Sequence, residues 1–194
     1  ISKENHQPKV VEGINKIIEL LRKNETKATF FVVGELLELK PELLDIILEN
    51  DHEIGFHTMK HTRIDLPNRK EQFQDEIKKF DKITNGKSKG FRAPSFSLNQ
   101  TSSWLIDVLE ENKYEYDSSI VPAKTSLYGM PNAKKTPYKI SSKNLEGELN
   151  EGKIIEFPLL VTKFLGKKIP AGGGFYLRTL PSRVIQNAIK SYEN

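Results

Sequence analysis

The chain alternates short apolar segments with amphipathic ones, and this alternation limits the folds that it can adopt. Residues 28–33 are apolar throughout and end at Gly34, which is typical of a strand buried on both faces. Residues 9–24 carry apolar side chains at helical spacing, which predicts an amphipathic helix. The same reasoning predicts strands at 53–56, 89–94, 115–117 and 154–157, and helices at 41–50, 68–84, 101–111 and 181–192, with Asn68 and either Thr101 or Ser102 as helix caps.

Strands that alternate with helices at intervals of roughly 25–35 residues are typical of a parallel sheet covered by helices. The sequence therefore predicts an α/β fold, either an open sheet or a barrel. The length of 194 residues suits a single domain. Residues 122–151 interrupt the rhythm with Pro, Gly, Ser and Lys. We interpret them as a long excursion, with room for a small hairpin, rather than as a linker between domains.

Three polar clusters begin where predicted strands end. They are HTMKH at 57–61, RAPSFS at 92–97 and DSSIVP at 117–122. In parallel α/β folds, ligands bind beyond the carboxyl ends of the strands, and these ends share one rim. The order of the strands alone therefore predicts a functional site where the three clusters meet.

His57 and His61 are candidate metal ligands. Imidazole nitrogens bind zinc and similar divalent ions, and two histidines four residues apart converge on one ion if the backbone turns helically. The same spacing also occurs in ordinary loops, so it is the rim position that favours a metal. Because the chain has no cysteine, we expect the third ligand to be a carboxylate.

Arg92, Ser95 and Asp117 are candidate catalytic residues. An arginine at a strand end can orient a carboxylate through a forked ion pair, although it can equally be a surface residue. Pro94 and Ser95 indicate a rigid turn whose backbone N–H groups can face an oxyanion. Asp117 can act as a ligand, a base or an orienting group, or it can cap the strand end by bonding to Ser119, and the sequence leaves these alternatives open.

A glycine-rich stretch near the end of the chain is a candidate for substrate contact. Gly172–Gly174 lack the residues that accompany glycines in phosphate-binding loops, which favours a loop approached closely by other groups. With the rim, this loop could form a groove for a glycan, and its candidate substrate-binding residues are Phe96, Gly173, Gly174 and Tyr176, together with Phe175.

Composition excludes some functions. The chain has no cysteine, which rules out disulfides, thiolate metal sites and a cysteine nucleophile. Its net charge of +4 comes from interspersed charges, so we expect no nucleic-acid partner. No apolar run approaches the roughly 18 residues of a membrane span. The sequence gives no indication of the oligomeric state or the compartment.

Taken together, these segments resemble the polysaccharide deacetylase (NodB-homology) family, and in particular its exopolysaccharide-type members. HTMKH is similar to the metal motif H-[ST]-x-x-H of that family, and GFRAPSFSL is similar to its R-x-P motif. YEYDSSIVP and IIEFPLLV…IPAGGGFYLR resemble later segments of the subgroup. The resemblance runs from about residue 9 to residue 192.

The resemblance implies one catalytic domain over residues 1–194, folded as a distorted (β/α) barrel of about seven strands whose two ends can be incomplete in this chain. It implies hydrolysis of N-acetyl groups on amino sugars of a polysaccharide or oligosaccharide, with a divalent metal, zinc above others, activating water. Carried over, His57 and His61 would bind the metal, Arg92 would hold the catalytic carboxylate and the Ser95 N–H would bind the oxyanion. Asp117 would support the rim.

Two parts of the family pattern are not found in this chain. No aspartate-rich strand end precedes residue 9, and no late histidine motif follows the glycine-rich stretch. Because the chain starts at Ile1, we expect it to be part of a longer enzyme and, taken alone, to bind metal weakly and turn over little substrate. The alternative is a non-catalytic glycan-binding relative that lacks the aspartate base and the histidine acid.

Overall fold

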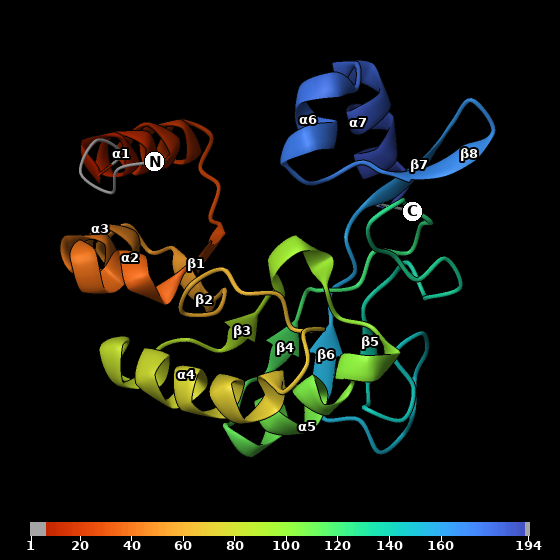
Figure 1. Ribbon diagram of the computed structural model, residues 1–194. Helices are drawn as coiled ribbons and strands as arrows, with labels where there is room; N and C mark the ends of the chain where they lie inside the picture. Colours follow the sequence, from red (N-terminus) through yellow and green to blue (C-terminus); the bar gives the residue numbers. More distant parts are fainter. Residues whose placement is uncertain (1–6, 193–194) are drawn as a thin grey trace.

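The computed structural model describes residues 7–192 of the chain (Figure 1). Its first part contains α1 (Gln7–Lys23), β1 (Thr29–Val32), α2 (Gly34–Leu39), α3 (Glu42–Glu49), β2 (Glu53–Phe56), α4 (Arg69–Ile83), β3 (Gly90–Phe91), α5 (Trp104–Glu111) and β4 (Tyr116–Asp117). Its second part contains β5 (Tyr138–Ile140), β6 (Ile154–Glu156), β7 (Val161–Phe164), β8 (Lys167–Pro170), α6 (Gly174–Thr179) and α7 (Ser182–Lys190).

A six-stranded sheet in the order β1-β2-β3-β4-β6-β5 forms the centre of the molecule. The first five strands in this order run parallel, and β5 runs antiparallel at the edge. This arrangement confirms the α/β prediction and the parallel strands. Strands β1 and β5 lie at opposite edges, so the barrel is open within residues 7–192. A separate hairpin, β7–β8, brings the described strands to eight.

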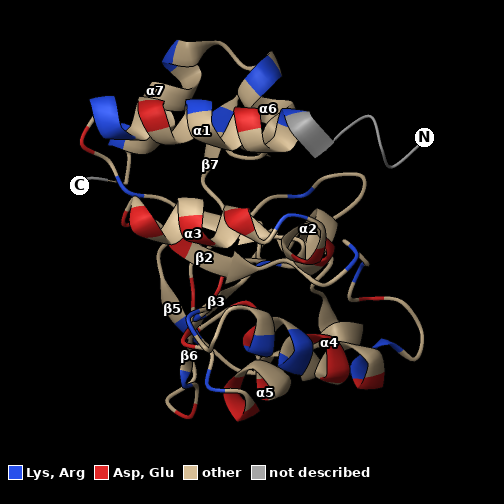
Figure 2. Ribbon diagram, turned by 90° about the vertical axis from the view of Figure 1, so that its left-hand side faces the viewer, with Lys and Arg blue, Asp and Glu red and all other residues tan. Residues whose placement is uncertain are grey.

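Helices α3, α4 and α5 cover one face of the sheet, which holds the main core. Side chains alternate along a strand, so Ile54 and Phe56 on β2 point to this face and are fully buried. Phe56 lies 4.4 Å from Phe80 and 5.6 Å from Phe91, measured between ring centres. Figure 2 shows that α4 carries Lys, Arg, Asp and Glu on its outer side, as an amphipathic helix does.

The predicted helix caps are right in one position only: Asn68 occupies the N-cap position of α4, whereas Thr101 and Ser102 are not caps. Asn68 precedes α4, but its φ of 55° is left-handed and its side chain makes no capping hydrogen bond, because a cap requires an extended backbone. Asn99 takes the role predicted for Thr101 or Ser102. Its side chain accepts a hydrogen bond from the Thr101 N–H (2.9 Å), and the Asn99 N–H donates to the Ser102 hydroxyl (3.0 Å). These two bonds start a short 3-10 turn before α5.

The second half of the chain contains structure that the periodicity did not reveal. The excursion 122–151 contributes β5 to the edge of the sheet, and residues 161–170 form the hairpin β7–β8. Gly174 is the first residue of α6, so only part of the glycine-rich stretch is a loop. None of the helices in residues 7–192 is long and apolar enough to cross a membrane.

A second, smaller apolar cluster joins this half to the strand ends. Val121, Leu159 and Val161 are buried together, and Phe96 and Tyr128 pack against them. Phe96 follows β3, whereas Val161 begins β7, so the cluster fixes the hairpin beside the carboxyl ends of the parallel strands.

We expect Phe56→Ala to lower the free energy of unfolding by roughly 3–5 kcal/mol, because the truncation leaves a cavity among three phenylalanine rings. Phe175→Ala is the matched control: Phe175 is 69% exposed, and its loss should change stability by less than about 0.5 kcal/mol. Urea denaturation followed by circular dichroism measures both. Equal losses for the two variants would contradict the assigned core.

Candidate active site

His57 follows β2 and turns its ring toward the end of β3. Its Nδ1 lies 2.6 Å from the carbonyl oxygen of Arg92. A carbonyl only accepts hydrogen bonds, so Nδ1 carries the proton and Nε2 keeps its lone pair. Burial lowers the pKa of His57 to about 4, despite the opposing effect of the Arg92 carbonyl. His57 is therefore neutral at neutral pH and presents Nε2 in the form that binds a metal.

A strained turn places His61 beside His57. Thr58 and His61 both have left-handed backbones, with φ of 59° and 57°, so the segment is a tight turn rather than the helical one that the spacing suggested. The two imidazole rings nevertheless lie 4.9 Å apart between centres. The two histidines therefore lie side by side, through a backbone conformation that differs from the one the spacing suggested, and their role as metal ligands stays a prediction.

Two helices hold this turn in place. At the start of α2, the N–H groups of Gly34 and Glu35 donate to the carbonyls of Thr58 (3.0 Å) and Met59 (2.9 Å). From α4, Glu76 accepts a hydrogen bond from the Met59 N–H (3.1 Å) and pairs with the buried Arg69 at 2.7 Å. These contacts offset the strain of the turn, as is common where backbone geometry serves a site.

Arg92 is fixed by its neighbours on three strands. Its Nε donates to the Ser118 carbonyl (2.9 Å) and its Nη2 donates to the Ser118 hydroxyl (2.6 Å). The Ser118 hydroxyl in turn donates to the Phe157 carbonyl (2.7 Å). The guanidinium lies 4.3 Å from the centre of the Phe31 ring, in a cation–π contact. Within residues 7–192 no carboxylate forms a salt bridge with Arg92, so its predicted orienting role stays a prediction.

Ser95 and Phe96 lie on the turn after β3, shortly after Arg92, whose carbonyl contacts His57. Both have left-handed backbones, with φ of 53° and 50°, and Ser95 is exposed. Two consecutive residues of this kind redirect the chain sharply at the rim. The placement is consistent with an oxyanion turn, which stays a prediction for the Ser95 N–H.

Three of the four predicted substrate-binding residues gather around Tyr128, which the sequence did not single out. The Phe96 ring lies 5.2 Å from the Tyr128 ring, and Gly173 lies beside Phe96. Burial raises the pKa of Tyr128, and the neighbouring Tyr176 adds to this effect. Gly174 lies in the open at the start of α6. A cavity of about 360 Å³ beside Phe96 and Tyr128 is also lined by Arg63, Asp65 and Asn99.

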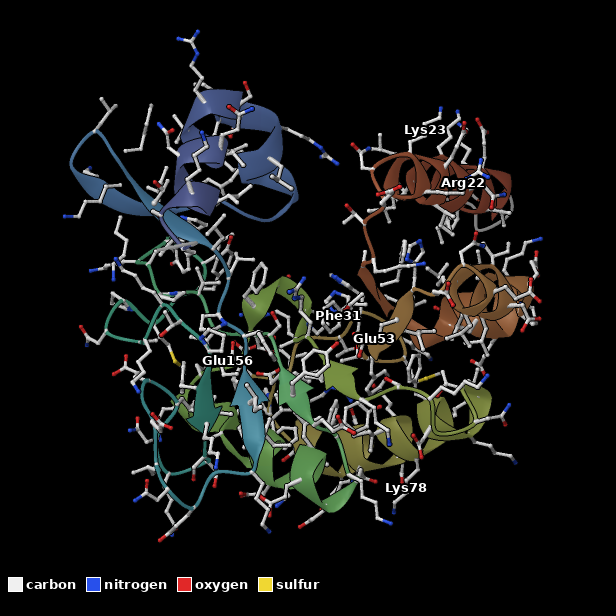
Figure 3. The ribbon with its side chains drawn as sticks, turned by 180° about the vertical axis from the view of Figure 1, so that it is seen from behind. Arg22, Lys23, Phe31, Glu53, Lys78 and Glu156 are labelled. Carbon is white, nitrogen blue, oxygen red and sulfur yellow. The ribbon has the colours of Figure 1, made fainter. Side chains whose placement is uncertain are left out.

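The face of the sheet opposite the main helices carries a second cavity, of about 390 Å³, next to Arg92. Phe31 and Glu53 reach over it from β1 and β2 (Figure 3). The rings of Phe31 and Tyr116 lie across Gly55 and Gly90, where any larger side chain would collide with them. The two glycines therefore make room for an aromatic lining around the guanidinium.

Asp117 lies on the other face of the sheet. It pairs in register with Phe91 and Glu156, and it is fully buried. Its Oδ1 accepts a hydrogen bond from the Ser119 hydroxyl (2.6 Å), the contact expected of a strand-end cap. The structure therefore does not bring the Asp117 carboxylate to the surface that carries His57 and Arg92, and its proposed catalytic role is untested.

Glu156 was missed by the sequence analysis and is the partner of Asp117. Its Oε1 accepts a hydrogen bond from the Ile120 N–H (3.0 Å), whereas Glu156 Oε2 and Asp117 Oδ2 are buried and lack other partners among the described residues. Burial, followed by the Asp117 charge, raises the pKa of Glu156 well above its usual range, and burial also raises the pKa of Asp117. One proton shared by the two carboxyls satisfies both oxygens.

A catalytic zinc takes three protein ligands. Within residues 7–192, no three His, Asp or Glu side chains gather closely enough to hold an ion, and no carboxylate joins the histidine pair. The described residues therefore fit a metal in part: they offer two imidazole nitrogens, one of them with a fixed tautomer.

Comparison with known proteins identifies the family of the chain. The family model of polysaccharide deacetylases matches residues 7–116, which is more than half of the chain. The chain belongs to the polysaccharide deacetylase family. A second family model, described as a domain of unknown function (DUF3473), matches residues 118–194 of this deacetylase-family chain.

Two curated deacetylases and one solved structure illustrate the similarity. The peptidoglycan-N-acetylglucosamine deacetylase of Bacillus cereus is 35% identical over 75 residues, covering 39% of this chain and 27% of that protein. The peptidoglycan-N-acetylmuramic acid deacetylase PdaA of Bacillus subtilis is 26% identical over 132 residues, covering 56% of this chain and 50% of that protein. The chain thus spans half the length of these relatives or less.

The solved structure of a candidate polysaccharide deacetylase from Mycobacterium smegmatis aligns with a TM-score of 0.58 at 21% identity, covering 76% of this chain and 45% of that chain. At this identity the likeness shows the fold alone, and it supports the (β/α)-barrel class that the family resemblance implied.

Glu76→Ala should lower the free energy of unfolding by about 3 kcal/mol, because it leaves the buried Arg69 charge unpaired and releases the Met59 N–H. Glu71→Ala, on the exposed side of the same helix, should cost no more than about 0.5 kcal/mol. Chemical denaturation measures both, and a loss in Glu76→Ala no larger than in the control would refute the support assigned to this turn.

The buried carboxyl pair predicts a pH dependence of stability. Because the pKa of Glu156 is raised in the folded state, the folded protein binds more protons than the unfolded chain above the ordinary value of 4.5, so stability should fall as pH rises from there toward the raised pKa. Glu156→Gln should flatten this slope, whereas Glu115→Gln, at an exposed neighbour, should not. Denaturation midpoints between pH 5 and 9 test it, and an unchanged slope in Glu156→Gln would contradict the shared proton.

Proposed function

We propose that the protein is a metal-dependent deacetylase that hydrolyses N-acetyl groups on the amino sugars of a polysaccharide. The observation that carries the proposal is the pair His57 and His61, with adjacent rings and a free Nε2 on His57, at the carboxyl ends of parallel strands beside Arg92. Membership of the polysaccharide deacetylase family supports it. The two curated deacetylases described above are named for action on amino sugars of peptidoglycan.

Bound at the two imidazoles, a zinc-type ion would supply a Lewis acid that polarises the amide carbonyl and acidifies water. The chain's own contribution is positioning. The Arg92 carbonyl holds the His57 ring in the ligand tautomer, and the Arg92 guanidinium places a fixed positive charge next to the site. The backbone N–H of Ser95, on the strained turn, is the group we assign to the developing oxyanion.

Sugar binding is assigned to the aromatic cavity at the rim. Phe96 and Tyr128 offer ring faces, and Asp65 and Asn99 offer hydrogen-bonding groups in the same cavity. A concave site with apolar walls and a few polar groups is typical of small-molecule and sugar sites. Gly173 and Tyr176 border this region, and Gly174 follows Gly173 as the first residue of α6.

We further propose that residues 1–194 form one catalytic domain, although two family models divide them near residue 117. Strand β6 from the second region pairs with β4 from the first. Ser118, at the start of the second region, holds the Arg92 guanidinium. The site is thus built from both regions.

The test is acetate release from N-acetylglucosamine oligomers by the protein at its full encoded length, with and without a chelator. His57→Gln and His61→Gln should each lower the rate at least roughly 100-fold, because losing a direct ligand costs no less than losing an outer partner of one. Readdition of zinc after chelation should restore the wild-type rate.

His52→Gln is the matched control, since His52 is buried beside Phe30 away from the rim and should retain most of the activity. Glycan binding that survives chelation, with no acetate released at any metal concentration, would overturn the proposal in favour of a non-catalytic glycan-binding protein.

A further inference from the structure

Residues 157–192, which we call the basic lobe, have an unusual charge pattern. They comprise the hairpin β7–β8 and helices α6 and α7, and they contain no Asp or Glu. The rest of the chain mixes both signs, so the small overall net charge conceals this local excess. The six basic residues of the lobe are Lys163, Lys167, Lys168, Arg178, Arg183 and Lys190.

Two of these lysines lie directly opposite each other on the hairpin. Lys163 on β7 is the register partner of Lys168 on β8, so both side chains leave the same face. Like charges at opposed positions of an antiparallel pair repel. Lys168 donates to the Pro131 carbonyl (2.6 Å), and within residues 7–192 neither lysine forms a salt bridge. Among the described residues, therefore, no carboxylate offsets this repulsion.

The same pair lines a cavity of about 420 Å³ between the hairpin, α7 and the excursion. Lys135 adds a third cation from a separate segment, and Val161 and Tyr192 supply apolar surface. The remaining lining residues are polar and uncharged: Thr136, Thr162, Asn187 and Ser191. Three cations, several neutral hydrogen-bonding groups and no carboxylate are complementary to an oxyanion on a ligand of sugar size.

The cavity adjoins the proposed active site through one side chain. Val161 both lines the cavity and packs in the apolar cluster that contains Phe96, which stands at the rim. Val161 is itself buried, so it shows that the cavity lies near the rim, and a linear polymer with one residue at the rim would reach the cavity with a neighbouring residue. The nearness of the cavity to the rim favours a long glycan as the ligand, because a glycan can occupy both places at once. A free small anion would occupy the cavity alone.

We propose that the lysine cavity binds the carboxylate of an acidic sugar, so that the substrate is an anionic N-acetylated polysaccharide. This inference rests on the proposed deacetylase function. Lys163 and Lys168 act as binding residues, and the bound carboxylate relieves their mutual repulsion. Neutral N-acetylglucosamine polymers lack this contact and bind more weakly.

Fluorescence anisotropy with a labelled hyaluronan octasaccharide, which alternates glucuronate with N-acetylglucosamine, tests the inference on the intact protein. The double variant Lys163→Gln/Lys168→Gln should bind at least about tenfold more weakly. The matched control Lys78→Gln/Lys82→Gln removes the same charge from α4, which lies on the far side of the molecule (Figure 3), and should bind as the wild type does. Binding should also weaken as salt rises.

Several results would overturn the inference. They are equal losses in both double variants, equal affinity for a neutral chitin octamer, and lysine-dependent binding to oligo-dT or to phosphatidylglycerol vesicles that exceeds binding to hyaluronan. Circular dichroism of both double variants verifies that they fold.

The binding measurement is independent of catalysis. If His57→Gln releases no acetate but still binds hyaluronan through Lys163 and Lys168, the inference is supported. If wild type releases no acetate yet shows this binding, the deacetylase proposal fails alone. If acetate is released from neutral and acidic glycans alike and the lysine variant binds normally, the inference fails alone.

Discussion

The hydrogen bond from His57 Nδ1 to the Arg92 carbonyl is the contact on which the site depends. It joins the ends of β2 and β3, and it settles which ring nitrogen of His57 is available. Because the guanidinium of the same residue donates to Ser118, directly after β4, one arginine links the ends of three strands at the rim. Hydrogen bonds from the start of α2 and to Glu76 on α4 hold the strained turn that contains His61. The placement of the two histidines is thus a property of the scaffold rather than of a flexible loop.

The alternation of side chains along each strand separates structural from chemical roles. Residues on the helix-covered face form the phenylalanine core and the Asp117–Glu156 pair, which is sealed from solvent. Residues on the opposite face, among them Glu53, Arg92 and Tyr116, line an open cavity. Asp117 stands in a polar cluster of the sequence, next to the Ser118 that bonds to Arg92. Its carboxylate nevertheless belongs to the core.

The features that depend on local sequence pattern could be predicted from the sequence. Strand 53–56 was predicted with its observed bounds, and the parallel order followed from alternation with helices. The sequence could not predict on which face of the sheet Asp117 lies. That face follows from the register of Asp117 with Phe91, which is a contact between distant segments. Glu156 stands in an apolar run whose burial pattern only its pairing with β4 and β5 reveals. The hairpin 161–170 had only a weak local signal, the turn at Gly166, because neither of its short strands alternates strictly between apolar and polar residues.

The central claim is that His57 is a neutral imidazole with its proton on Nδ1, ready to bind a metal through Nε2. Nitrogen-15 NMR of the imidazole ring at pH 7 tests this most directly. The account predicts the Nδ1–H tautomer, with the Nε2 resonance shifting on addition of zinc and the Nδ1 resonance nearly unchanged. An Nε2–H tautomer, a protonated ring at pH 7, or an Nε2 resonance that zinc leaves unmoved would contradict it.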